Sequence, residues 1–96
     1  MSSIEFIANL ERIIEQRLDG STEGSYTASL AAAGHKRVAQ KVGEEAVELA
    51  LAAMDGDRAE ILNEASDLVY HLLVLLRIRN LSLADVAATL EQRHVD

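Results

Sequence analysis

Five acidic side chains in two short segments have the types and spacing that metal-ion chemistry needs. Glu44, Glu45 and Glu48 lie in the first segment, and Glu64 and Asp67 lie in the second. On a helix, residues three positions apart share a face, so Glu45 would lie beside Glu48, and Glu64 beside Asp67. Both pairs fall on or next to an apolar stripe, where four carboxylates repel one another unless a cation neutralises them. Mg²⁺ and Mn²⁺ are hard cations that prefer oxygen ligands, so this pattern predicts a site for one or more such ions.

The two acidic segments must lie side by side for these carboxylates to meet. Residues 55–57, Asp-Gly-Asp, have the composition of a turn, and two helices joined by it would pack antiparallel. Counted from this turn, Glu48 and Glu64 lie at comparable distances, and Glu45 and Asp67 lie one turn further away. We therefore predict that Glu45, Glu48, Glu64 and Asp67 are metal ligands. The alternative is that these acids form a solvated face with ordinary ion pairs to a nearby lysine.

The whole chain of 96 residues has the pattern of one all-α domain over 1–96. Proline is absent, alanine and leucine are abundant, and no segment shows the sustained alternation typical of a strand. The expected helices cover residues 4–18, 27–33, 36–54, 58–79 and 82–93. They make a five-helix chain with two long antiparallel helices. After Asp67 the fourth helix is apolar on nearly every face, so we expect a helical-bundle homodimer to cover it.

Composition and charge argue against several classes of function. The net charge of −7 argues against a general affinity for nucleic acid or for anionic lipid. The apolar run at residues 72–76 is far shorter than the roughly 20 residues that a membrane-spanning helix needs. No cysteine is present, which excludes disulfides and thiolate metal sites and fits a reducing cytoplasm. A carboxylate-bridged di-iron bundle would need Glu-x-x-His pairs, which the acidic segments lack.

Four longer segments carry a resemblance to a known family. They are SYTASL (25–30), KVGEEAVELALAA (41–53), EASDLVYHLLVLL (64–76) and ATLEQRH (88–94). The acidic pattern alone is similar to the all-alpha nucleotide pyrophosphohydrolases, the MazG-like group. The complete set resembles the phosphoribosyl-ATP pyrophosphatases of histidine biosynthesis. The resemblance covers nearly the whole chain, although the proline that many members carry shortly before SYT is absent.

The resemblance implies an activity, a cofactor and an assembly. The implied activity is hydrolysis of 1-(5-phosphoribosyl)-ATP to 1-(5-phosphoribosyl)-AMP and pyrophosphate, the second step of L-histidine biosynthesis. The resemblance also implies Mg²⁺ dependence and a homodimer. Some members are fused to the cyclohydrolase of the next step, and we expect this short chain to be the free-standing version. Two alternatives stay open: a house-cleaning pyrophosphatase for a non-standard nucleoside triphosphate, and a non-catalytic helical dimerisation module.

Several residues near the acids have two interpretations each. Glu44 is a further metal ligand or the base that activates the water, or else a plain surface acid. Lys41 contacts a phosphate, or it pairs with acids of its own helix. Lys36 meets the phosphates, or it is solvated at the start of its helix. His71 holds an acid or a substrate hydroxyl in place, or it is a hydrogen-bonded core histidine, whereas Tyr70 is expected to pack.

Three hydroxyl-bearing residues, Ser25, Tyr26 and Thr27, precede the second expected helix. Together with the free backbone N–H groups of a helix N-terminus, their hydroxyls would make a phosphate cradle. The alternative is an ordinary N-cap with a packed tyrosine. The candidate substrate-binding residues are therefore Ser25, Tyr26, Thr27, Lys36, Lys41 and His71.

Overall fold

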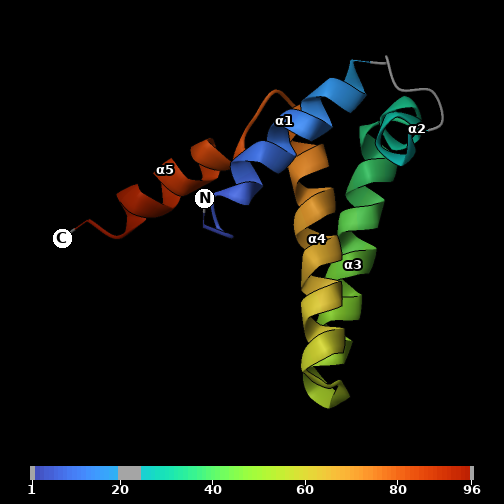
Figure 1. Cartoon of the computed structure of the whole chain (residues 1–96), viewed down its shortest axis with the longest axis vertical. Helices are drawn as coiled ribbons and strands as arrows, with labels where there is room; N and C mark the ends of the chain where they lie inside the picture. The colour runs from blue at the N-terminus through green and yellow to red at the C-terminus, as the bar shows by residue number, and fades with distance from the viewer. Residues whose placement is uncertain (1, 20–24, 96) are drawn as a thin grey trace.

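The computed structural model describes residues 2–19 and 25–95, and within these residues all regular secondary structure is helical. The helices are α1 (Phe6–Leu18), α2 (Tyr26–Ala32), α3 (His35–Asp55), α4 (Arg58–Ile78) and α5 (Leu83–Arg93). This order confirms the predicted all-α chain of five helices (Figure 1). The largest difference in bounds is at α1, which begins at Phe6 because residues 3–5 form a turn instead. In the described part of the chain, no helix combines the length and the apolarity that crossing a membrane requires.

The helices α3 and α4 form the antiparallel hairpin that the sequence predicted (Figure 1). Asp57 caps α4, because its Oδ1 accepts a hydrogen bond from the Glu60 amide at 2.9 Å. The backbone makes a close contact at Gly56, whose amide donates to the Ala52 carbonyl at 2.6 Å. A Cβ at this position would lie 2.6 Å from the same carbonyl oxygen. Glycine is therefore required in the turn, and the turn determines which residues of the two helices face each other.

The apolar core lies at the end of the hairpin opposite the turn, where α1 and α2 contact α4 (Figure 1). Its buried side chains are those of Ile14, Leu30, Val38, Leu73 and Val74. Within residues 2–19 and 25–95, no other helix covers the turn end of the hairpin (Figure 1). The large apolar side chains there, Val47, Leu51, Met54 and Leu62, are consequently exposed. A single copy of the chain therefore leaves apolar surface uncovered on half of its longest element.

The short helix α2 is defined at both ends by local backbone chemistry. At its start, Ser25 Oγ accepts a hydrogen bond from the Ala28 amide at 3.3 Å. Just beyond its end, Gly34 has a φ of 97°, in the left-handed region that glycine adopts without strain. These features fix the length of α2, but its place against α4 depends on side-chain contacts.

The last helix, α5, extends away from the bundle (Figure 1). Ser82 and Asp85 form a capping box at its start, and the Leu83 amide donates to Glu11 Oε2 of α1 at 3.0 Å. No residue of α5 is buried, and Leu90 is exposed. A helix of 11 residues is marginal in water by itself. The helix α5 therefore offers a face for further packing.

Candidate metal centre

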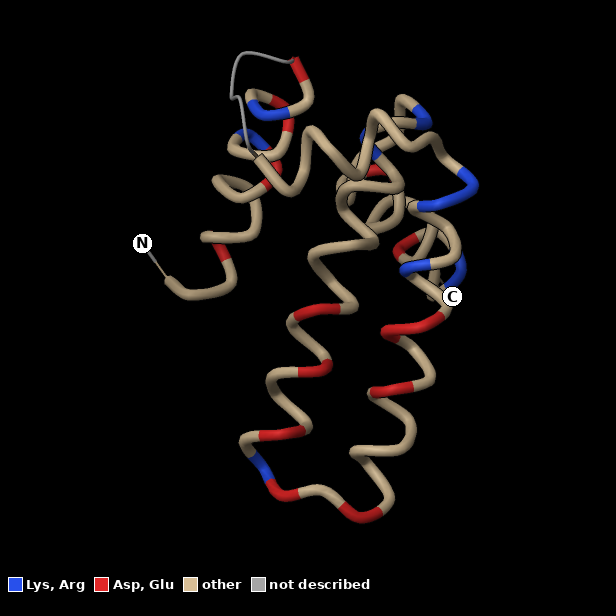
Figure 2. Tube along the Cα trace, turned by 90° about the vertical axis from the view of Figure 1, so that its right-hand side faces the viewer, with Lys and Arg blue, Asp and Glu red and all other residues tan. Residues whose placement is uncertain are grey.

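Three carboxylates converge where α3 and α4 face each other. Glu45 and Glu48 lie on α3 and Glu64 lies on α4, and one oxygen from each lies within 4.8 Å of the others. We call these three residues the acidic cluster. Figure 2 shows acidic residues along both arms of the hairpin, and Arg58 is the only Lys or Arg between residues 42 and 76. The antiparallel packing thus brings together three of the four predicted metal ligands.

Two oxygens of the acidic cluster have no hydrogen-bond partner among the residues that the structure describes. They are Oε2 of Glu45, a residue that is only 6% exposed, and Oε2 of Glu64. A buried carboxylate oxygen is normally hydrogen-bonded or bound to a cation, since an unpaired buried charge is costly. A divalent cation fits these unpartnered oxygens, and it fits a donor set of three carboxylates without sulfur.

The proximity of like charges changes the protonation of the acidic cluster. The pKa of Glu48 is raised from its usual 4.5 to about 7, chiefly because a protonated Glu48 can hydrogen-bond Glu64 and then Glu45. Burial acts to raise the pKa of Glu45 as well. The hydrogen bonds from Lys41 and Glu48 outweigh burial, and the pKa of Glu45 is lowered. Without a neutralising cation, Glu48 is therefore the member that takes up a proton.

Lys41 borders the acidic cluster on α3. Its Nζ lies 3.3 Å from Glu45 Oε1 and 3.5 Å from Glu44 Oε1. The hydrogen bond to Glu45 is the main reason that the pKa of Lys41 is raised. Lys41 thus makes the ion pairs within its own helix that were one of its two predicted roles. Its side chain remains partly exposed, so the contact with a phosphate stays a prediction.

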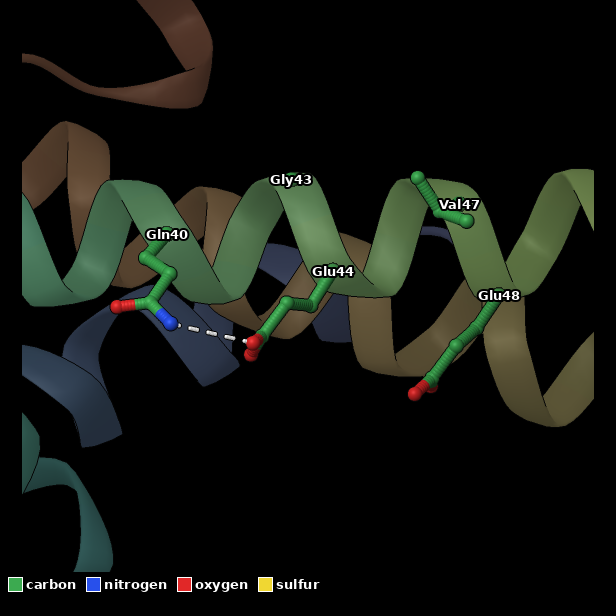
Figure 3. Close-up of a pocket in the computed structure, with 5 residues that line it drawn as sticks. All are labelled: Gln40, Gly43, Glu44, Val47 and Glu48. Carbon is green, nitrogen blue, oxygen red and sulfur yellow. Dashed lines mark hydrogen bonds between the residues drawn. The ribbon is translucent and has the colours of Figure 1, made fainter.

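Glu44 lies one turn before Glu48 on an open recess of the α3 surface (Figure 3). The recess is lined by Gln40, Gly43, Glu44, Val47 and Glu48. Gln40 Nε2 donates to Glu44 Oε2 at 3.2 Å, and Figure 3 shows the carboxylates of Glu44 and Glu48 projecting from the same side of α3. Glu44 is exposed, so its carboxylate is accessible to a water molecule. This position is compatible with the predicted role as base, which stays a prediction.

The fourth predicted ligand, Asp67, is not part of the acidic cluster. Its side chain is exposed, and it contributes none of the converging oxygens. Its backbone carbonyl instead accepts a hydrogen bond from His71 Nδ1 at 2.7 Å. Because Nδ1 carries a proton, Nε2 of a neutral His71 is an acceptor, and the Tyr26 hydroxyl donates to it at 2.7 Å. Asp67 would need another rotamer to join the acidic cluster, so its ligand role stays a prediction.

The predicted substrate-binding residues near α2 differ in how accessible they are. Ser25 is half-buried and Tyr26 is exposed. Thr27 is 0% exposed, and its hydroxyl contacts that of Tyr70. Thr27 is therefore not accessible to a substrate in this structure, and its predicted phosphate contact stays a prediction. Lys36 is exposed in the first turn of α3.

Comparison with known proteins identifies the family. The family model described as phosphoribosyl-ATP pyrophosphohydrolase matches residues 7–94. The chain belongs to this family. The resemblance seen in the four sequence segments is thereby confirmed. Glu45, Glu48 and Glu64 all lie inside the part of the chain that matches the phosphoribosyl-ATP pyrophosphohydrolase model.

Three similar proteins are each named histidine biosynthesis bifunctional protein HisIE. The chain is 58% identical over 89 residues to that of Shewanella oneidensis, an alignment covering 93% of this chain and 42% of the relative. It is 52% identical over 92 residues to that of Photobacterium profundum, covering 96% and 44%. It is 55% identical over 89 residues to that of Escherichia coli O157:H7, covering 93% and 44%. The chain thus spans less than half the length of these relatives.

Two residues that pack near α2 make contacts that were not predicted from the sequence. Tyr70 was expected only to pack, yet its hydroxyl contacts that of Thr27 and accepts a hydrogen bond from Arg17 Nη1 at 3.4 Å. No role was predicted for Arg17 from the sequence. The partners of Tyr70 lie 43 and 53 positions away along the chain, so no local spacing predicts these contacts.

Proposed function

We propose that this chain hydrolyses 1-(5-phosphoribosyl)-ATP to 1-(5-phosphoribosyl)-AMP and pyrophosphate, the second step of L-histidine biosynthesis, in the cytoplasm. The observation that carries the proposal is the acidic cluster, with its two unpartnered buried oxygens, in a chain of the phosphoribosyl-ATP pyrophosphohydrolase family. The relatives named for histidine biosynthesis support the choice of pathway.

The proposed cofactor is Mg²⁺, with Mn²⁺ as a substitute. Glu45, Glu48 and Glu64 would hold the ion, and Asp67 is proposed as a fourth ligand one turn further along α4. When bound, such an ion neutralises charge on the triphosphate and makes its bound water more acidic. The raised pKa of Glu48 supports this site, because a cation takes the place of the proton that Glu48 otherwise binds.

The neighbouring side chains act on the substrate and on the attacking water. Lys41 offsets the negative charge of the triphosphate, and Ser25 and Tyr26 contact its outer oxygens. Lys36, exposed at the start of α3, meets a further phosphate. Glu44 accepts a proton from the water as the new P–O bond forms and the bridging P–O bond between the α- and β-phosphates breaks. The accessibility of these side chains supports the proposed roles. For Lys41 the ion pairs with Glu44 and Glu45 support its role as well.

We propose that two copies of the chain form a homodimer. The turn half of the hairpin exposes Val47, Leu51, Met54 and Leu62, and α5 has no buried residue. Exposed apolar residues gathered in this way are typical of surfaces that pack against a partner. A second copy related by two-fold symmetry would cover both regions at once.

The decisive experiment is the release of pyrophosphate from 1-(5-phosphoribosyl)-ATP with and without Mg²⁺. We expect turnover only with the ion. In Glu48→Gln and Glu64→Gln turnover should fall by about 100-fold or more, because a cation ligand is lost. Glu91→Gln is the matched control, since Glu91 is an exposed acid on α5, outside the hairpin. Its turnover should equal that of the wild type.

Two other outcomes would overturn the proposal. Turnover of nucleoside triphosphates from a panel, without turnover of 1-(5-phosphoribosyl)-ATP, would identify a house-cleaning pyrophosphatase. Absence of turnover, together with an unfolding temperature that Mg²⁺ does not change, would identify a non-catalytic dimerisation module.

A further inference from the structure

Two polar contacts hold the start of α2 against α4, and each helix contributes two consecutive residues to them. The Tyr26 hydroxyl donates to His71 Nε2 at 2.7 Å, and the Thr27 hydroxyl contacts the Tyr70 hydroxyl. Residue 26 thus pairs with 71, and residue 27 pairs with 70. We call these two contacts the α2 clamp.

The α2 clamp is buried on one side and open on the other. Thr27 is 0% exposed and His71 is 7% exposed, whereas Tyr26 is 53% exposed. On the buried side, Arg17 of α1 donates to the Tyr70 hydroxyl at 3.4 Å. A hydroxyl that accepts from Arg17 keeps its own proton to donate to Thr27. The Thr27 side of this contact is shielded from solvent, and through Tyr70 and Arg17 the contact joins α2 to both α4 and α1.

The helix α2 contacts α1 and α3 as well as α4, and its first turn depends on such tertiary contacts for its orientation. The helix has seven residues, too few to be stable without tertiary contacts. Its buried residues are Thr27 and Leu30, and Leu30 lies in its last turn. The α2 clamp is therefore the main polar constraint on the first turn.

The first turn of α2 lies over the part of α4 that continues from the acidic cluster. His71, to which Tyr26 bonds, follows Glu64 by seven positions, about two helical turns along the same face of α4. The helices α2 and α3 are also in contact. Tyr26 is 53% exposed, so part of its surface is accessible to a ligand that extends from the acidic cluster.

We propose that Tyr70 is a positioning residue for substrate binding that acts through Thr27. The Thr27–Tyr70 contact holds the first turn of α2 where Ser25 and Tyr26 meet the phosphates of a substrate bound at the acidic cluster, a role that rests on the proposed function. Tyr70 does this without touching the substrate. Contacts with phosphates remote from the reacting bond stabilise the bound substrate and the transition state alike. Losing them raises KM more than it lowers kcat.

Two substitutions that each remove one hydroxyl test the proposal. In Tyr70→Phe and in Thr27→Val, we expect KM for 1-(5-phosphoribosyl)-ATP to rise about five- to tenfold, as for one lost hydrogen bond. The kcat should stay within about twofold of the wild-type value. The double variant should have the same KM as either single variant, because both remove the same contact. Thr27→Ser keeps the hydroxyl and should restore KM to near the wild-type value.

A matched control and two contrary results make the test decisive. Thr89→Val removes a hydroxyl that bonds within α5, to the Asp85 carbonyl, and it should leave KM unchanged. If Tyr70→Phe lowers the unfolding temperature while KM of the folded enzyme stays at the wild-type value, Tyr70 has only a structural role. If the KM effects of the two single variants multiply in the double variant, the residues do not act through each other.

Amide hydrogen exchange separates failure of this proposal from failure of the proposed function. In Tyr70→Phe we expect faster exchange at residues 28–32 than in the wild type, with unchanged exchange in the middle of α3. A wild type that does not hydrolyse 1-(5-phosphoribosyl)-ATP refutes the proposed function and the positioning role with it, while exchange still reports on the α2 clamp. An active wild type with unchanged exchange and KM in Tyr70→Phe refutes the positioning role alone.

Discussion

At the scale of single residues, Glu48 is the member of the acidic cluster that interacts with both of the others. Glu45 is buried and paired with Lys41, and Glu64 is half-buried on the opposite helix. Glu48 is exposed, and its pKa of about 7 shows that it responds to both neighbours. It is therefore the carboxylate at which a proton and a divalent cation compete most directly.

The stability of the protein without divalent cations should depend on pH through Glu48. The pKa of Glu48 is raised from 4.5 to about 7 on folding, so between these values the folded state binds the extra proton. The resulting stabilisation is fully present below pH 4.5 and is lost as the pH rises through about 7. We expect the free energy of unfolding, measured by chemical denaturation in EDTA, to contain this falling contribution. In Glu48→Gln that contribution should be absent.

The comparison with Glu48→Gln is needed because Glu45 has the opposite effect on how the free energy of unfolding depends on pH. The pKa of Glu45 is lowered, so its contribution is present above its usual pKa and is lost as the pH falls. Subtracting the curve of Glu48→Gln from that of the wild type reduces the Glu45 contribution, which both proteins contain. A difference that stays constant between pH 4.5 and about 7 would contradict the assigned role of Glu48.

Sequence spacing predicted the acidic cluster but not everything around it. The three acids follow from the helical repeat and from the position of one turn, which are both local properties. Asp67 shares the same stripe on a helical wheel, yet its side chain is exposed, because a wheel gives the direction of Cβ and not the rotamer. The contact between Thr27 and Tyr70 depends on where α2 docks. No local pattern contains that information.

At the scale of elements, the α3–α4 hairpin aligns the acids. Each helix has 21 residues, and the turn between them ends α3 at Asp55 and starts α4 at Arg58. The sequence predicted these bounds to within one residue, because helix formation and capping depend on neighbours in the chain. It did not predict that α5 would extend away from the bundle, since that depends on tertiary contacts.

Gly56→Ala should destabilise the hairpin. The added Cβ would lie 2.6 Å from the Ala52 carbonyl oxygen, which is part of the backbone and cannot rotate away. We expect a loss of about 1–3 kcal/mol in the free energy of unfolding, measured by urea denaturation. Turnover should fall too, because a displaced turn shifts Glu48 relative to Glu64. An unchanged unfolding midpoint would contradict the tight contact.

Gly43→Ala, the matched control inside α3, should have the opposite effect on stability. A Cβ at Gly43 meets no atom within 4 Å, and Gly43 lies inside α3. Alanine has less backbone freedom to lose than glycine, so the free energy of unfolding should rise by about 0.5–1 kcal/mol. A loss of stability in the same urea experiment would indicate that another surface packs closely on Gly43.

At the scale of the whole molecule, the hairpin carries both the acidic cluster and exposed apolar side chains. The acids lie between its arms, and exposed apolar side chains lie elsewhere on its surface. One apolar groove between α1 and α4 is lined by Phe6, Ile7, Leu10, Leu62, Ala65, Ser66 and Val69. Of these residues, Phe6 is 50% exposed and Leu62 is 53% exposed. The proposed homodimer would cover this groove while the acidic cluster binds its ion.

Leu62→Lys should dissociate the proposed homodimer. In a monomer this change at an exposed position would alter stability by only about 0.5 kcal/mol. In a dimer it would bury a charge in an apolar interface, and the dissociation constant should rise by about tenfold or more. Sedimentation velocity over a range of concentrations measures the change. Gln16→Lys, at an exposed polar position of α1, is the control, and a wild type that sediments as a monomer would contradict the proposal.

The hairpin also affects the order in which parts of the chain fold. Its contacts join helices that are neighbours in sequence, and such local contacts form quickly. The chain has no proline, so no slow peptide isomerisation delays folding. The carboxylates are thus expected to gather early, before α1 docks against α4. The repulsion between these carboxylates would then raise the free-energy barrier to folding. A divalent cation in the solution would lower that barrier before any catalytic site exists.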